Sequence, residues 1–156
     1  MDILMSKYLT RYIWLWLPAT VLAFLPDGIL PPATTFLAGM AVSAILLVGW
    51  AVNTAMFCYR RPLAALAVPV GLEGFSLLGI LLRTLGVFTG RFSYVLFGLP
   101  SYLPLSPFVG ALSDFPGLNA ELAVTLVLLG CCLIGYGVGF INRLVNPNPY
   151  RPRLEE

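Results

Sequence analysis

The chain has 156 residues, of which 59% are hydrophobic and 10% are charged, and its formal net charge is +2. Soluble domains are about half apolar and a quarter charged, and a small fold has too much surface to hide so much apolar side chain. This composition excludes an ordinary soluble domain and indicates a protein of the lipid bilayer. The basic residues occur only in ones and twos, which excludes a nucleic-acid-binding patch.

The chain contains no histidine. This absence excludes Ser-His and Cys-His nucleophile pairs and zinc or haem sites that depend on histidine. Three cysteines, Cys58, Cys131 and Cys132, lie in or beside apolar runs, and an odd number of them makes a poor disulfide framework. We interpret them as small packing residues, and we expect no catalytic residue, cofactor or metal site.

A transmembrane helix needs about 20 residues to cross about 30 Å of hydrocarbon. The first predicted helix covers residues 9–26. Tyr12, Trp14 and Trp16 form an aromatic belt near its start, and Arg11 can extend to the lipid headgroups. The basic start resembles a signal peptide, but the bulky aromatic residues favour a retained helix.

The second predicted helix covers residues 34–59 and ends at Arg60 and Arg61. Pro62 suits the first turn of a third helix, predicted over residues 62–86. The two helices should therefore form a tight antiparallel hairpin.

Residues 87–118 are as apolar as a helix but carry four prolines: Pro100, Pro104, Pro107 and Pro116. Each interior proline costs a helix about 3 kcal/mol, which argues against a continuous span. Irregular backbone cannot face lipid inside the hydrocarbon region. The segment should therefore lie at the interface or re-enter the membrane while covered by protein.

The fourth predicted helix covers residues 119–143, with Asn119 as its N-cap and Glu121 in its first turn. A polar, proline-rich tail follows over residues 144–156. The sequence thus predicts an all-α fold in one transmembrane domain, residues 1–156, with four transmembrane helices and a broken segment between the third and the fourth.

The basic residues predict the orientation. With both termini in the cytoplasm, only Arg83 and Arg91 lie near the outer side. The other seven basic residues are cytoplasmic: Lys7, Arg11, Arg60, Arg61, Arg143, Arg151 and Arg153.

Glu73 is the single carboxylate well inside a predicted span, about 16 Å along the helix from Pro62. A charge at that depth costs at least ~2.5–3.5 kcal/mol and needs a partner. Glu73 therefore marks a candidate ion or proton site with Asn53 and Ser76. The alternative is a protonated Glu73 that bonds to Asn53 or Ser76 and only holds helices together. The helix around it is interrupted by Pro69, Gly71 and Gly74.

Arg83 and Arg91 lie close in sequence to Tyr94 and Tyr102. Guanidinium groups bind phosphate well, so these four residues form a candidate site for a lipid headgroup. The alternative is an interfacial anchor.

Small residues spaced by four mark two candidate helix-contact faces: Gly135 with Gly139, and Gly39 with Ser43. Such faces let backbones approach closely, within one chain or between subunits.

Three functions are open on the sequence. The first is a non-enzymatic subunit of a larger membrane complex or homo-oligomer, with other membrane subunits or a second copy as partner. The second is a small transporter or channel unit that uses Glu73. The third is a protein that binds or modifies lipid at the outer leaflet, with Asp27 and Asp114 as an acid/base pair beside Arg83 and Arg91.

Overall fold

The computed structural model describes residues 3–23, 32–88, 90–113 and 115–146, and this part of the chain is helical, with no strand. The all-α prediction is confirmed. Six helices follow one another in the described residues: α1 (Ile3–Ala23), α2 (Pro32–Arg60), α3 (Pro62–Thr84), α4 (Arg91–Gly98), α5 (Ser106–Ser113) and α6 (Ala120–Val145).

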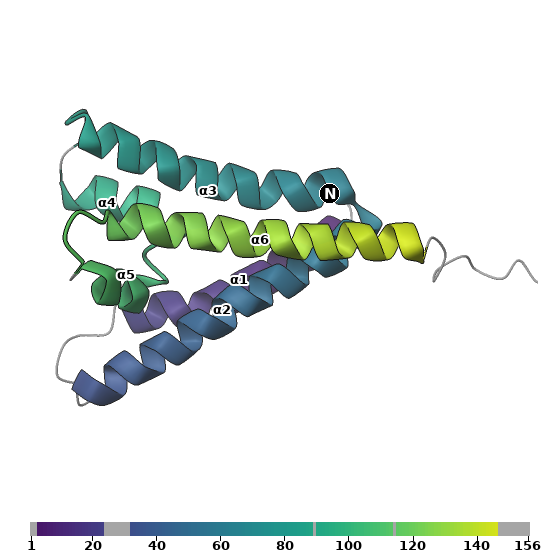
Figure 1. Ribbon diagram of the computed structural model, residues 1–156, viewed down its shortest axis with the longest axis horizontal. Coiled ribbons are helices and arrows are strands. Elements are labelled where there is room, and N and C mark those ends of the chain that lie inside the picture. The colour runs from purple at the N-terminus through teal and green to yellow at the C-terminus, as the bar shows by residue number, and fades with distance from the viewer. Residues whose placement is uncertain (1–2, 24–31, 89, 114, 147–156) are drawn as a thin grey trace, which may run out of the picture.

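Four long helices run lengthwise, with α6 between α2 and α3 in the view of Figure 1. The most extensive contact joins α2 and α6, α3 packs against both, and α1 packs against α2. The start of α1, the α2–α3 turn and the end of α6 lie towards one end, which we call the basic end. The short helices α4 and α5 lie towards the opposite end.

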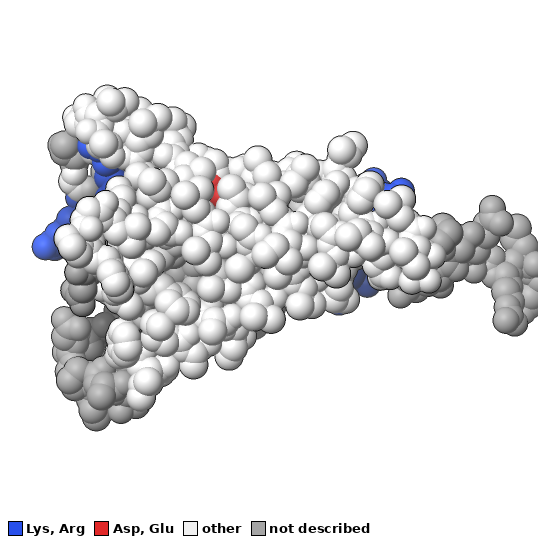
Figure 2. Space-filling view, in the orientation of Figure 1, with Lys and Arg blue, Asp and Glu red and all other residues white. Residues whose placement is uncertain are grey.

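Three helices are long and apolar enough to cross a membrane: Phe36–Arg60, Pro62–Thr84 and Ala120–Val145. Many large apolar side chains on them face outward, among them Ile45, Leu81 and Ile134. In Figure 2, Lys and Arg atoms show only near the two ends of the visible face, with a belt free of them between. These features support a multi-pass integral membrane protein.

The expected fourth span is not among these helices. Helix α1 runs from Ile3 to Ala23 and carries Lys7 and Arg11 in its first half. The predicted end of this helix, residues 24–26, lies outside the described residues.

The other boundaries lie within a few residues of those predicted. Pro62 opens α3, and the Asn119 side chain accepts a hydrogen bond from the Leu122 amide, as expected of an N-cap. Helix α6 continues two residues past the predicted end, to Val145. Residues 147–156 of the predicted tail lie outside the described residues.

Residues 87–118 contain two eight-residue helices, α4 and α5, instead of one long helix. The turn between them is buried from Ser101 to Leu105. Its backbone is satisfied locally, because the amides of Ser101 and Leu103 both donate to the Gly98 carbonyl. The helical hairpin is thus inserted among the long helices, with α4 against α3 and α5 against α2 and α6.

The glycines of α6 explain why it lies so close to α2. A Cβ atom on Gly135 would collide with the Ala51 carbonyl, and one on Gly139 with the Ala55 carbonyl. Of the two contacts that the spacing allows, this face makes the one inside the chain. On the second candidate face, Gly39 packs against Pro107 of α5 and Ser43 is buried.

Candidate functional site

Glu73 lies at the middle of α3 and is fully buried. Neither of its carboxylate oxygens has a hydrogen-bond partner in the described part of the chain. Leaving a buried polar group unpaired costs about 1–3 kcal/mol, and more if the group is charged. Helix packing alone gives no reason to keep this side chain here.

Other elements surround the carboxyl. Ser101, on the buried turn between α4 and α5, has its hydroxyl near the carboxyl, although the two groups form no hydrogen bond of ordinary geometry. Tyr12 of α1 and Cys132 of α6 lie close enough to interact with it electrostatically. The site is therefore built by α1, α3, α6 and the hairpin together, and motion of the hairpin would change it.

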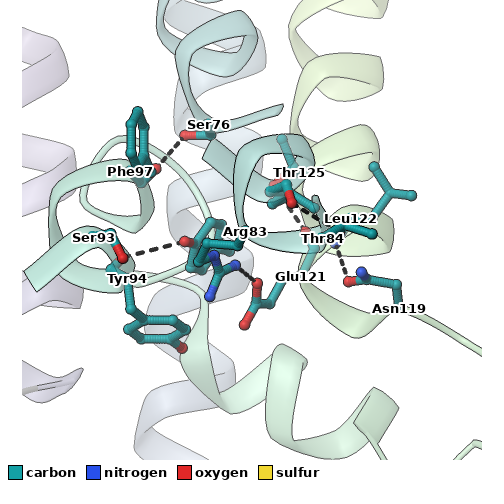
Figure 3. Close-up of polar contacts among 12 residues, drawn as sticks. Ser76, Arg83, Thr84, Ser93, Tyr94, Phe97, Asn119, Glu121, Leu122 and Thr125 are labelled. Atoms are coloured by element: carbon teal, nitrogen blue, oxygen red, sulfur yellow. Dashed lines mark hydrogen bonds and ion pairs between the residues drawn. The ribbon is translucent and has the colours of Figure 1, made fainter. Parts of the chain in front are cut away.

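The two partners predicted for Glu73 bond elsewhere. The Ser76 hydroxyl, one turn along α3, donates to the Phe97 carbonyl at 2.8 Å (Figure 3). The Asn53 amide donates to the Tyr8 carbonyl at 3.4 Å. The alternative hypothesis, in which Glu73 holds helices together through a hydrogen bond to Asn53 or Ser76, is therefore wrong about these two partners.

Polar groups continue from Glu73 towards the α4–α5 end. The hydroxyls of Ser101 and Thr125 are 3.3 Å apart, and the Thr125 hydroxyl donates to the Glu121 carbonyl. The Glu121 carboxylate pairs with Arg83. Figure 3 shows Arg83 pointing from α3 to Glu121 on α6. Arg83 and Glu121 also line a cavity of about 440 Å³ at this end.

The Arg83 guanidinium makes an ion pair and two cation–π contacts within the chain. Besides its ion pair with Glu121, its guanidinium lies 5.1 Å from the Tyr94 ring centroid and 5.5 Å from that of Tyr102. Burial raises the pKa of Tyr94, which keeps this phenol neutral. The structure thus joins three residues of the predicted headgroup site. The fourth, Arg91, is exposed at the start of α4, with no described contact to them.

Polar groups also lead from Glu73 towards the basic end. Tyr8, one turn before Tyr12 on α1, has its hydroxyl near that of Thr54 on α2. The hydroxyls of Tyr8, Tyr12 and Thr54 are buried and have no hydrogen-bond partner in the described residues. Tyr8 and Asn53 line a second cavity, of about 560 Å³. Buried polar side chains thus lie on both sides of Glu73, and they form no continuous chain of hydrogen bonds in the described residues.

A metal site does not emerge from the described residues, which contain no group of three His, Cys, Asp or Glu side chains. Asp27 and Asp114, the acid/base pair of the third hypothesis, lie outside the described residues.

Several residues of the site escaped the sequence reading. Ser101 is one of several serines in an apolar, proline-rich run, and Thr125 is the one Thr or Ser of the apolar helix α6. Such polar residues in membrane segments are a usable signal. Their meeting with Glu73 depends on the insertion of the hairpin, which the sequence pattern did not specify.

The chain matches no protein-family model, no curated protein and no solved structure. Its function therefore has to be argued from the site.

Proposed function

We propose that this protein is a small proton-coupled transport unit of the membrane and that Glu73 is its proton-carrying group. The observation that carries the proposal is the fully buried, unpaired carboxyl at the middle of an apolar span. Intramembrane carboxylates of this kind are costly, and they mark ion or proton pathways in pumps and transporters.

The surroundings favour a proton over a metal cation. A metal cation would need several oxygen ligands. Among the described groups that interact with the Glu73 carboxylate, there is no second carboxylate to serve as such a ligand. Hydroxyls, by contrast, both donate and accept, so Tyr12 and Ser101 can pass a proton to and from a carboxyl.

The α4–α5 hairpin is the element that we propose to control access. Its buried turn places Ser101 against Glu73, and α1 holds the turn through a hydrogen bond from the Trp16 indole to the Leu99 carbonyl, 2.6 Å long. We treat the hairpin as a re-entrant element, because its irregular backbone is covered by other helices.

We also propose that α1 is the fourth span, with both termini in the cytoplasm. Its 21 residues correspond to about 32 Å of helix, and it carries no charged residue after Arg11. The positive-inside rule then assigns the basic end to the cytoplasm.

Proton flux into liposomes that contain the purified protein tests the proposal. An entrapped pH indicator reports entry of protons after a potassium-diffusion potential is imposed. We expect flux with the wild-type protein, none above empty liposomes with Glu73→Gln, and partial flux with Glu73→Asp, which keeps a titrating group.

Ser43→Ala is the matched control. It removes a buried hydroxyl of α2 that has no hydrogen-bond partner in the described residues, and it leaves the Glu73 carboxyl in place. Its flux should stay close to that of the wild type. Full flux through Glu73→Gln would refute a proton-carrying role for Glu73, and absence of flux in the wild-type protein would refute the transport unit.

A subunit role is the second candidate, and the outward face of α3 favours it. Gly71 and Gly74 are exposed, and no described atom would lie within 4 Å of a Cβ added to either. A helix of a second polypeptide could approach closely there. Replacing both glycines with leucine should then reduce the mass of the complex measured by native mass spectrometry, whereas an unchanged mass would argue against this face.

A further inference from the structure

The cavity at the basic end has walls from three helices. Lys7, Tyr8 and Arg11 of α1, Asn53 and Met56 of α2, and Asn142 of α6 are among its lining residues. Its volume of about 560 Å³ is large enough for a small organic anion. The proton-carrying role proposed above for Glu73 leaves this cavity unexplained.

The charged residues that line this cavity in the described part of the chain are all basic. Lys7 and Arg11 are four residues apart on α1 and therefore share a face, and Arg60 is a third basic residue of the lining. Asp and Glu do not occur among the described lining residues. The Arg11 guanidinium contacts only a weak acceptor, the Met56 sulfur, in the contacts described for it. A planar guanidinium and an ammonium on one wall suit a phosphate group.

The inner wall supplies uncharged polar groups. The Tyr8 side chain is 2% exposed, and its hydroxyl has no hydrogen-bond partner in the described residues. Asn142, at the rim, carries an exposed amide. A bound headgroup would thus meet hydrogen-bonding groups as well as charge.

The cavity also opens sideways onto the apolar belt. Met56 and Val138 line it, yet their side chains are 54% and 58% exposed. Exposed Val52 and Ile134, one turn further from the basic end on α2 and α6, extend this apolar surface. Acyl chains could follow this surface while a headgroup stays in the cavity, an arrangement that a free phosphate ion would not use.

The geometry points to a binding site for the phosphate of an anionic phospholipid at the basic end, with Lys7 and Arg11 as its main ligands. Basic pockets between transmembrane helices bind anionic headgroups in this way. The site is independent of Glu73, so proton flux and lipid binding can fail separately.

Native mass spectrometry of the full chain, released from detergent with added lipid, tests the site. The probes are phosphatidylglycerol, which is anionic, and phosphatidylcholine, which carries a phosphate but no net charge. We expect the wild-type protein to prefer phosphatidylglycerol about tenfold. The Lys7→Gln/Arg11→Gln variant should lose roughly that factor.

The control variant, Arg61→Gln/Arg143→Gln, removes two positive charges towards the same end that do not line the cavity. It should keep the preference, and an equal loss in both double variants would show attraction by surface charge alone and overturn the proposal. An undiminished preference in Lys7→Gln/Arg11→Gln would also overturn it.

Two further arms complete the test. Asn142→Asp adds a negative charge at the rim without changing side-chain size, so it should weaken binding even if the double variant fails to fold. Inorganic phosphate, added in millimolar excess, should leave phosphatidylglycerol bound. Displacement by inorganic phosphate would assign the cavity to a soluble anion and contradict the lipid assignment.

Discussion

Glu73 is the residue whose presence helix packing explains least. A carboxyl that served as a helix tie would be bonded, but both of its oxygens are buried and unpaired, while Ser76 and Asn53 bond to backbone carbonyls. A group that costs stability and is nevertheless kept is typical of a functional site.

This cost leads to a stability prediction. Glu73→Met replaces the carboxyl with an apolar side chain of similar size, so the free energy of unfolding should rise by about 1–3 kcal/mol. Thermal unfolding in detergent measures it. Ser76→Ala should instead cost about 1 kcal/mol, because it leaves the Phe97 carbonyl unpaired. A clearly destabilised Glu73→Met would mean that Glu73 makes bonds that hold the fold.

Arg83 gives a second prediction at the residue scale. Its side chain and that of Glu121 are 21% and 23% exposed, so solvent screens their ion pair only in part. A double-mutant cycle with Arg83→Gln and Glu121→Gln should give a coupling of about 1 kcal/mol in the free energy of unfolding. Strictly additive effects would show that the ion pair adds nothing to stability.

At the scale of elements, hydrophobic runs and proline positions predicted α2, α3 and α6 to within a few residues, because length, caps and breakers act locally. The use of each helix face could not be predicted in the same way. Gly135 and Gly139 fit an inner or an outer contact equally well by spacing, and the structure places them against α2.

The same limit applies to the candidate site. Glu73 was identifiable from the sequence, since a carboxylate in an apolar run is costly wherever the run packs. Its neighbours were not identifiable, because Ser101 reaches it through the turn of the α4–α5 hairpin, and that contact depends on tertiary packing.

The α2–α6 contact can be tested with matched glycines. Gly135→Ala places a methyl group against the Ala51 carbonyl and should destabilise the fold by about 1–3 kcal/mol. Gly137→Ala, on an open face of the same helix, should stabilise it by about 0.5–1 kcal/mol through helix propensity. Thermal unfolding of both variants decides, and equal effects would contradict the packing described here.

For the whole molecule, the arrangement of charges predicts its orientation. Phe115 and Asn146 are both exposed, near the start and after the end of α6. In a cysteine-free background, Phe115→Cys should react with a membrane-impermeant thiol reagent added to intact cells, and Asn146→Cys should react only after permeabilisation. The reverse pattern would invert the topology, and labelling of both from outside would exclude an odd number of spans between them.

The proposed transport requires that Glu73 take up and release a proton inside the membrane. Infrared difference spectroscopy of the protein in liposomes observes this step directly, through the C=O stretch of a protonated carboxyl. We expect such a band in the wild-type protein, its absence in Glu73→Gln, and its reversible loss as the bulk pH is raised. The proposed proton transfer would be contradicted by a Glu73 C=O band that stays unchanged at every pH at which the protein remains folded. It would also be contradicted if no band could be assigned to Glu73.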